Sequence, residues 1–238
     1  MIVEHNTVKI YFGDKKDGLT TTFYLNLNEP HLLDIAPFKA LTNNLPLHAL
    51  MFTEQVHGTH GIAVDSATLV NTKAFSVEGD YVMTNVPGIG LGVMSADCLP
   101  VIIIDTKHRA IAAIHSGWRG TVKGIVIKAL QHMNVEYGTQ VEDVTVIFGP
   151  AAGACCYEVQ SDFLDAIPQQ LISHSIIERD GKIYFDNTAY NIQLLKQRGV
   201  QSQQIITQHN ICTMCEPSYC SYRRDKSVDR QMSVVTLV

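Results

Sequence analysis

The chain has 238 residues, 46% of them hydrophobic, which is enough to bury a full core in one domain over residues 1–238. Its 18 basic and 23 acidic residues give a formal charge of -5, so no general attraction to nucleic acid or to an anionic membrane is expected. The start, MIVEHNTVKI, does not have the pattern of a secretory signal, and no stretch approaches the roughly 18 apolar residues of a membrane span. We therefore expect a cytoplasmic monomer whose six cysteines stay reduced.

Apolar runs of strand length recur along the chain. They are TVKIYF at 7–12, TTFYLNL at 21–27, ALMFTEQV at 49–56, YVMTNV at 81–86, IGLGV at 89–93, PVIIID at 100–105, AIAAIH at 110–115 and VTVIFG at 144–149. The last three runs do not alternate apolar with polar residues, which predicts central strands covered on both faces. Helices are expected to flank this sheet.

Two further segments have helical spacing. One is predicted to begin at Thr121, a favourable N-cap residue. The other is predicted to begin at Asp186 or the residue after it and to end at Gly199. A weaker helical pattern over 163–172 is interrupted by a proline. The order of these elements predicts the α/β class, as a mixed-sheet layered α/β sandwich.

Three loop-forming segments carry reactive side chains: EQVHGTHG at 54–61, SADCLP at 95–100 and HSGWRG at 115–120. Because each reactive residue follows or precedes a predicted strand, they are expected to converge at one edge of a sheet. His57, Cys98 and His115 supply two imidazoles and a thiolate, a donor set that suits zinc or copper and leaves a position open for water or substrate. The alternative is that both histidines are turn residues and Cys98 is a small core residue.

Two arginine-bearing segments are candidate anion sites. In HSGWRGT, a helix beginning at Thr121 would direct unpaired N–H groups at an oxyanion, and Arg119 would add a guanidinium. In SYRRD at 221–225, Arg223 lies among tyrosines. The alternatives are that Arg119 pairs with a structural carboxylate and that SYRRD is a solvated turn.

The remaining cysteines suggest a second site only weakly. The C-x-x-C at Cys212 and Cys215 could join Cys155 and Cys156 around a structural zinc. Adjacent cysteines seldom both bind one tetrahedral ion, so this site is not expected.

Taken together, several motifs resemble those of the laccase-domain family, once labelled multicopper polyphenol oxidase and later associated with purine nucleoside phosphorolysis and adenosine deamination. The motifs are QVHG at 55–58, GDYVMT at 79–84, SADCLPV at 95–101, HSGWRGT at 115–121, GP at 149–150, CYEV at 156–159, CT at 212–213 and SYRRD at 221–225. They span nearly the whole chain in the family's order. The resemblance implies a layered α/β fold and a catalytic zinc held by His57, Cys98 and His115.

The sequence departs from the family pattern at three places. The family's N-terminal arginine aligns near Lys15, which lacks the planar guanidinium fork. The C-terminal Gly-Arg pair appears as Asp229 and Arg230, and Ser116 replaces a usual alanine. These departures bear on the substrate range more than on the metal site.

The activity that the resemblance implies is zinc-dependent cleavage of adenosine, inosine, guanosine or methylthioadenosine by inorganic phosphate, with adenosine deamination as a further activity. Such a site needs an anion seat and a way to neutralise the leaving purine. Arg119 and Arg223 are the candidate phosphate ligands, and Asp80 is a further candidate for substrate binding. Either Asp97 or Asp80 is a candidate proton relay, and Asp97 could instead orient a ligand histidine.

Three alternatives stay open. Relatives of the family are associated with editing of peptidoglycan precursors, for which Cys98 would be the nucleophile and His115 the base. Copper oxidation of phenols is disfavoured because a multicopper site needs many more histidines. The third alternative is a zinc-stabilised interaction protein without turnover.

Overall fold

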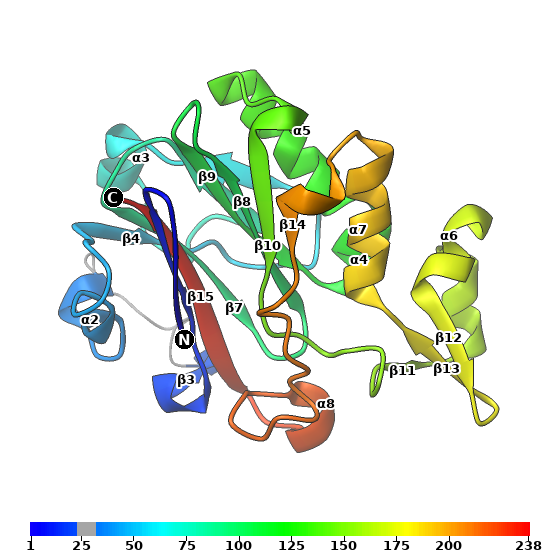
Figure 1. The fold of residues 1–238 in the computed structure, drawn as a ribbon. Helices are drawn as coiled ribbons and strands as arrows, with labels where there is room; N and C mark the ends of the chain where they lie inside the picture. The colour runs from blue at the N-terminus through cyan, green and yellow to red at the C-terminus, as the bar shows by residue number, and fades with distance from the viewer. Residues whose placement is uncertain (23–31) are drawn as a thin grey trace.

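The computed structural model describes residues 1–22 and 32–238 and contains two stacked mixed sheets with helices on the outer face of the second (Figure 1). The first sheet has the order β1 (Ile2–His5), β2 (Val8–Phe12), β15 (Asp229–Leu237), β7 (Ile89–Ser95) and β4 (Ala49–Met51), with β3 (Leu19–Thr20) paired to β15. The second has the order β14 (Ile205–Ile206), β10 (Val144–Phe148), β8 (Leu99–Asp105), β9 (Ala110–Ser116), β6 (Tyr81–Thr84) and β5 (Gly61–Ala63). The predicted fold class, a mixed-sheet layered α/β sandwich, is confirmed.

A small third sheet and short helices complete the fold. The third sheet has the order β11 (Glu158–Val159), β13 (Lys182–Phe185) and β12 (Ile176–Arg179), and projects to one side with α6 (Gln169–Ser175) (Figure 1). The other helices are α2 (Phe38–Leu41), α3 (Ser66–Asn71), α4 (Trp118–Val122), α5 (Ile125–Tyr137), α7 (Asn187–Gln197) and α8 (Tyr222–Asp225). None of the helices in the described residues is long and apolar enough to cross a membrane.

The strands β8, β9 and β10 are central and buried on both faces, as their uninterrupted apolar sequences predict. On one face, residues such as Ile103 pack against α5 and α7. On the other face, residues such as Ile102 pack against β2, β7 and β15 of the first sheet. The expectation that helices flank the sheet is thus correct for one face only, because a second apolar sheet buries the other face equally well.

Most predicted strands are confirmed, with two differences. The strand expected at 49–56 ends at Met51, and the run at 21–27 lies outside the described residues from residue 23 onward. The long strand β15 was not predicted, although its side chains from Gln231 to Leu237 are all buried. It pairs with both β2 and β7, so residues 229–237 lie beside residues 8–12 in the same sheet.

The helix expected to begin at Thr121 is instead divided in two. Helix α4 begins at Trp118 after Gly117, and α5 begins after Gly124, whose φ of 75° is left-handed. The Thr121 hydroxyl is buried and donates to Asn187 Oδ1 at 2.6 Å, so it joins α4 to α7 and caps no helix. The helix predicted from Asp186 is confirmed as α7. The Asp186 side chain caps this helix by accepting a hydrogen bond from Ala189 N.

Candidate metal centre and adjoining cavity

The side chains of His57, Cys98 and His115 meet at one edge of the second sheet, as predicted. Strands β8 and β9 are antiparallel with Leu99 opposite Ser116, so Cys98, directly before β8, lies beside the end of β9 that carries His115. The donor atoms of the three side chains all lie within 4.8 Å of one another. His57 Nε2 is 3.8 Å from Cys98 Sγ, and the two imidazole rings are 4.9 Å apart.

His57 reaches this edge from a loop and does not follow directly on a strand. After β4 ends, the chain is fastened to β7 by Gln55, whose side chain accepts from Met94 N at 2.7 Å and donates to Met94 O at 2.8 Å. These bonds substitute for strand pairing. His57 itself has a φ of 59°, and this left-handed turn directs the chain toward Cys98.

Asp80 fixes both histidines from behind. Its carboxylate accepts from His115 Nδ1 at 2.8 Å, from His57 N at 2.9 Å and from Gly58 N at 2.6 Å, and the residue is fully buried. Burial by itself would raise the pKa of Asp80, but the hydrogen bond and charge of His115 and the backbone donors lower it below its usual range. The bond at Nδ1 leaves His115 Nε2 free to bind a metal.

The two candidate carboxylates have different surroundings. Asp80, a candidate for substrate binding, is buried behind His115 and positions that ring. Asp97, a candidate catalytic residue, accepts from Thr213 Oγ1 and from Arg223 N, each at 2.7 Å. Asp97 therefore anchors the C-terminal segments, and Asp80 orients the histidine.

The cluster favours a thiolate even without a metal. Burial opposes ionisation of Cys98, but the adjacent charge and hydrogen bond of His115 lower the pKa of Cys98 to about 6. Burial likewise opposes protonation of His115, but the Cys98 thiolate and Asp80 raise the pKa of His115 to about 9. A thiolate is the form of cysteine that binds metals.

The donor set fits one zinc or copper ion with three protein ligands and an open position. Within residues 1–22 and 32–238, His57 and His115 are the histidines found in a group able to hold a metal. A blue-copper site together with a copper cluster would need many more histidines. This finding argues against multicopper chemistry.

Gly117 lies against this cluster, and a methyl group on its Cα would collide with the His57 side chain. A Cβ there would lie 2.8 Å from His57 Cδ2 and 3.3 Å from Cys98 Sγ. We expect Gly117→Ala to displace His57 and weaken zinc binding at this cluster by about 10-fold, with little loss of stability because its φ of -67° suits alanine. Zinc titration against a competing chelator measures this, and unchanged affinity would contradict it. Gly181→Ala, at an open turn remote from the cluster, is the control for zinc affinity only: it should keep that affinity although its left-handed φ of 70° makes alanine cost stability.

A cavity of about 330 Å³ lies near the cluster: its wall contains Trp118, the residue after Gly117, and Tyr157, on which the Cys98 charge acts. It is lined by Trp118, Tyr157, Glu158, Val159, Gln160, Asp162, Phe163, Ala166 and Arg223. Burial and the nearby Cys98 charge raise the pKa of Tyr157, so this phenol keeps its proton. The wall thus offers aromatic surface, a phenol and a cation. Of these residues, Arg223 was a predicted site residue.

Tyr157 and Phe163 were not predicted to line a site. The CYEV motif at 156–159 was the available signal for Tyr157, but a single aromatic residue in a motif is more often part of a core. Nothing in the sequence around Phe163 marks it as a cavity residue.

Each of the two predicted anion ligands contacts an aromatic residue of the cavity wall. Arg119 is exposed, and its guanidinium carbon lies 4.8 Å from the Trp118 ring centroid. The Arg223 guanidinium carbon lies 4.4 Å from the Tyr157 ring centroid, and the side chain donates to the Glu158 carbonyl. Lys15, which aligns near the family arginine, pairs with Asp225 at 3.0 Å.

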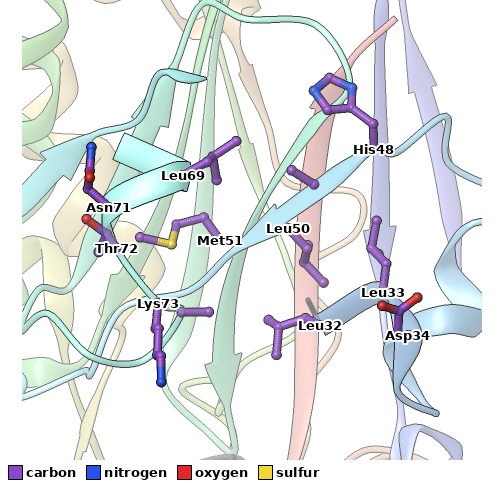
Figure 2. Close-up of a pocket in the computed structure, with 12 residues that line it drawn as sticks. Leu32, Leu33, Asp34, His48, Leu50, Met51, Leu69, Asn71, Thr72 and Lys73 are labelled. Carbon is purple, nitrogen blue, oxygen red and sulfur yellow. The ribbon is translucent and has the colours of Figure 1, made fainter. Parts of the chain in front are cut away.

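A larger cavity of about 680 Å³ lies elsewhere, between Leu32–Asp34, β4 and α3. Figure 2 shows Leu69 and Asn71 on one side of it and Leu33 and Asp34 on the other. Its lining contains none of the predicted site residues, and much of it is aliphatic. The smaller cavity, whose lining includes Arg223, is therefore the candidate substrate cavity.

The fold and the cluster define an α/β protein with three side chains that could hold a metal, close to an aromatic cavity. Residues 37–238 match the protein family described as multi-copper polyphenol oxidoreductase laccase, and the chain belongs to this family.

Named relatives share much of the chain. It is 34% identical over 170 residues to a purine nucleoside phosphorylase of Aquifex aeolicus, covering 71% of this chain and 76% of the relative. It is 36% identical over 163 residues to the purine nucleoside phosphorylase CA_C1699 of Clostridium acetobutylicum, covering 67% of each. The crystal structure of the Bacillus licheniformis hypothetical protein YfiH is similar with a TM-score of 0.80 and 27% identity, covering 98% of this chain and 94% of that chain.

Proposed function

We propose that this protein is a zinc-dependent purine nucleoside phosphorylase that acts as a monomeric, cytoplasmic, single-domain enzyme on adenosine, inosine, guanosine and methylthioadenosine. The observation that carries the proposal is the cluster of His57, Cys98 and His115 close to a cavity whose wall contains aromatic side chains and Arg223. The names of the relatives support the same activity class.

The cavity suits a purine nucleoside chemically. Trp118 and Phe163, whose ring centroids are 5.2 Å apart, offer flat apolar surface for a purine base. The protonated Tyr157 can donate a hydrogen bond to a ring nitrogen or a ribose hydroxyl. The cavity volume of about 330 Å³ lies at the small end of the range for ligand pockets, which fits a nucleoside.

In phosphorolysis, a phosphate oxygen attacks the anomeric carbon of the ribose while the bond to the purine nitrogen breaks. Arg119 and Arg223 can hold phosphate, since a guanidinium presents paired donors to an oxyanion. Asp97 positions the backbone of Arg223, and Asp80 holds His115 in one tautomer. A zinc held by His57, Cys98 and His115 would supply Lewis acidity that stabilises developing negative charge.

Arg119→Lys tests the phosphate seat. Lysine keeps the positive charge but lacks the paired N–H donors of the guanidinium, so the KM for phosphate should rise about 10-fold while zinc content stays unchanged. The control is Arg109→Lys, because Arg109 is also exposed but precedes β9 at its opposite end. Initial rates at varied phosphate measure both. Zinc loss or unfolding in Arg119→Lys would instead make Arg119 structural.

The activity itself is tested by incubating zinc-loaded protein with each nucleoside, with and without phosphate, and separating the products by chromatography. We expect free base and pentose 1-phosphate only when phosphate is present. Intact nucleosides at every phosphate concentration, together with loss of an amino acid from a nucleotide-linked muramyl substrate, would replace this proposal with the editing hydrolase. Inosine formed from adenosine without phosphate would reveal the deaminase activity, which we also propose because three protein ligands leave a position for water.

A further inference from the structure

Four cysteines outside the histidine-containing cluster lie together on the surface. The Sγ atoms of Cys155, Cys156, Cys212 and Cys215 are all within 4.8 Å of one another. Cys215 Sγ is 3.5 Å from Cys155 Sγ and 3.2 Å from Cys156 Sγ. A tetrahedral zinc with Zn–S bonds of about 2.3 Å separates its sulfur ligands by about 3.8 Å, so the four atoms are spaced for one ion.

The local backbone removes the reason for which adjacent cysteines were not expected to share an ion. A tight turn begins at Gly153, whose carbonyl accepts from Cys156 N and from Tyr157 N, each at 2.9 Å. The turn brings the side chains of Cys155 and Cys156 to the same neighbour, Cys215. Two adjacent cysteines in an extended strand would point to opposite faces, and the turn removes that obstacle.

The two cysteine-bearing loops are also held together by their backbones. Ala151 N donates to Ile211 O and Thr213 N donates to Ala151 O, each at 3.0 Å. Gly153 N donates to Cys212 Sγ at 3.3 Å. The four sulfur atoms are therefore brought together by a backbone framework that does not depend on a metal.

A nearby guanidinium group partly compensates the charge that such a site would carry. Arg179 donates to the Cys155 carbonyl at 2.9 Å, whereas Arg224, which donates to the Thr213 carbonyl at 2.6 Å, is already paired with Asp225 at 2.7 Å. A zinc ion with four thiolates has a net negative charge, which adjacent cations stabilise. All four residues are free cysteines, so the thiols are present to bind a metal.

We propose that Cys155, Cys156, Cys212 and Cys215 form a second, structural zinc site, distinct from the site of His57, Cys98 and His115. Four thiolate ligands fill the coordination sphere and leave no position for substrate, as in structural zinc sites. The site joins the turn before the cavity residue Tyr157 to the loop before Arg223. Its role is to hold these two parts of the cavity wall together.

Zinc content separates the two sites. The protein purified under reducing conditions is expected to hold two equivalents of zinc, and the double variant Cys212→Ser, Cys215→Ser one. Cys98→Ala should also hold one, whereas Cys220→Ser should hold two, because the buried Cys220 belongs to neither cluster. The single variant Cys155→Ser, at an exposed cysteine, provides the same comparison if the double variant fails to fold.

Cobalt identifies the ligands directly. Cobalt added to metal-free Cys98→Ala should give the absorption bands of a tetrahedral tetrathiolate site, and these bands should be lost in Cys98→Ala combined with Cys215→Ser. The double variant should also have a lower Tm in the absence of substrate. Zinc content that is the same in the wild type and in the Cys212→Ser, Cys215→Ser variant, no tetrathiolate bands in cobalt-loaded Cys98→Ala, or a Cys156–Cys215 disulfide in unreduced protein would overturn the proposal. None of these measurements depends on catalytic turnover, so they test the four-cysteine site independently of whether the protein has the proposed phosphorylase activity.

Discussion

Cys98→Ala is expected to lower kcat/KM for inosine phosphorolysis by more than about 100-fold, beyond the range of about 10–100-fold that follows loss of a group supporting a metal ligand. The reason is that Cys98 supplies the only thiolate of the cluster that also contains His57 and His115. Removing it leaves two neutral imidazoles, which hold zinc more weakly. The measurement is the rate of base release in phosphate buffer, together with zinc content.

The control for this variant is Cys220→Ala, which removes a thiol that is 1% exposed and lies in neither cluster. It should keep both the activity and the zinc. Full activity in Cys98→Ala would refute a catalytic role for the cluster. Lost activity with zinc retained would point instead to a cysteine nucleophile, the chemistry of the editing alternative.

Asp80→Asn is expected to weaken zinc binding at the His57, Cys98 and His115 cluster by about 10–100-fold. The asparagine side chain has one acceptor oxygen where the carboxylate has two, and its NH₂ group would face the N–H of His115 or of Gly58. Loss of the buried negative charge should also lower the free energy of unfolding by about 3 kcal/mol. Zinc titration and urea denaturation measure the two effects separately.

Asp105→Asn offers a closely matched control. Asp105 is also fully buried, and it accepts from His108 Nδ1 at 2.8 Å and from Lys107 N at 2.9 Å. It lies at the end of β8 opposite to Cys98, so it has the same local chemistry without the metal cluster. It should lose stability but keep zinc affinity. Equal zinc affinity in both variants would show that Asp80 supports the fold alone.

The sequence by itself determined the central sheet and the three candidate ligands. Uninterrupted apolar runs such as PVIIID and AIAAIH can only be buried on both faces, so their central position follows from composition. His57, Cys98 and His115 each lie among glycines or next to such a run, which places them at the edge of the sheet. Local sequence was sufficient for Cys98 and His115, which adjoin or end buried strands, whereas His57 also depends on the hydrogen bonds between Gln55 and Met94.

Only the tertiary structure decided what depends on pairing between distant segments. Asp80 lies behind His115 because β6 pairs with β9 in a register that sets Tyr81 opposite Ile114. Thr121 resembles an N-cap in sequence, but the hydrogen bond of its hydroxyl to Asn187, 66 positions away, outweighs that local preference. The four surface cysteines meet because a turn at Gly153 and a backbone bridge from Ala151 to Cys212 join two loops. Residue spacing cannot encode such contacts, since strand register and loop closure are fixed by the burial of the whole core.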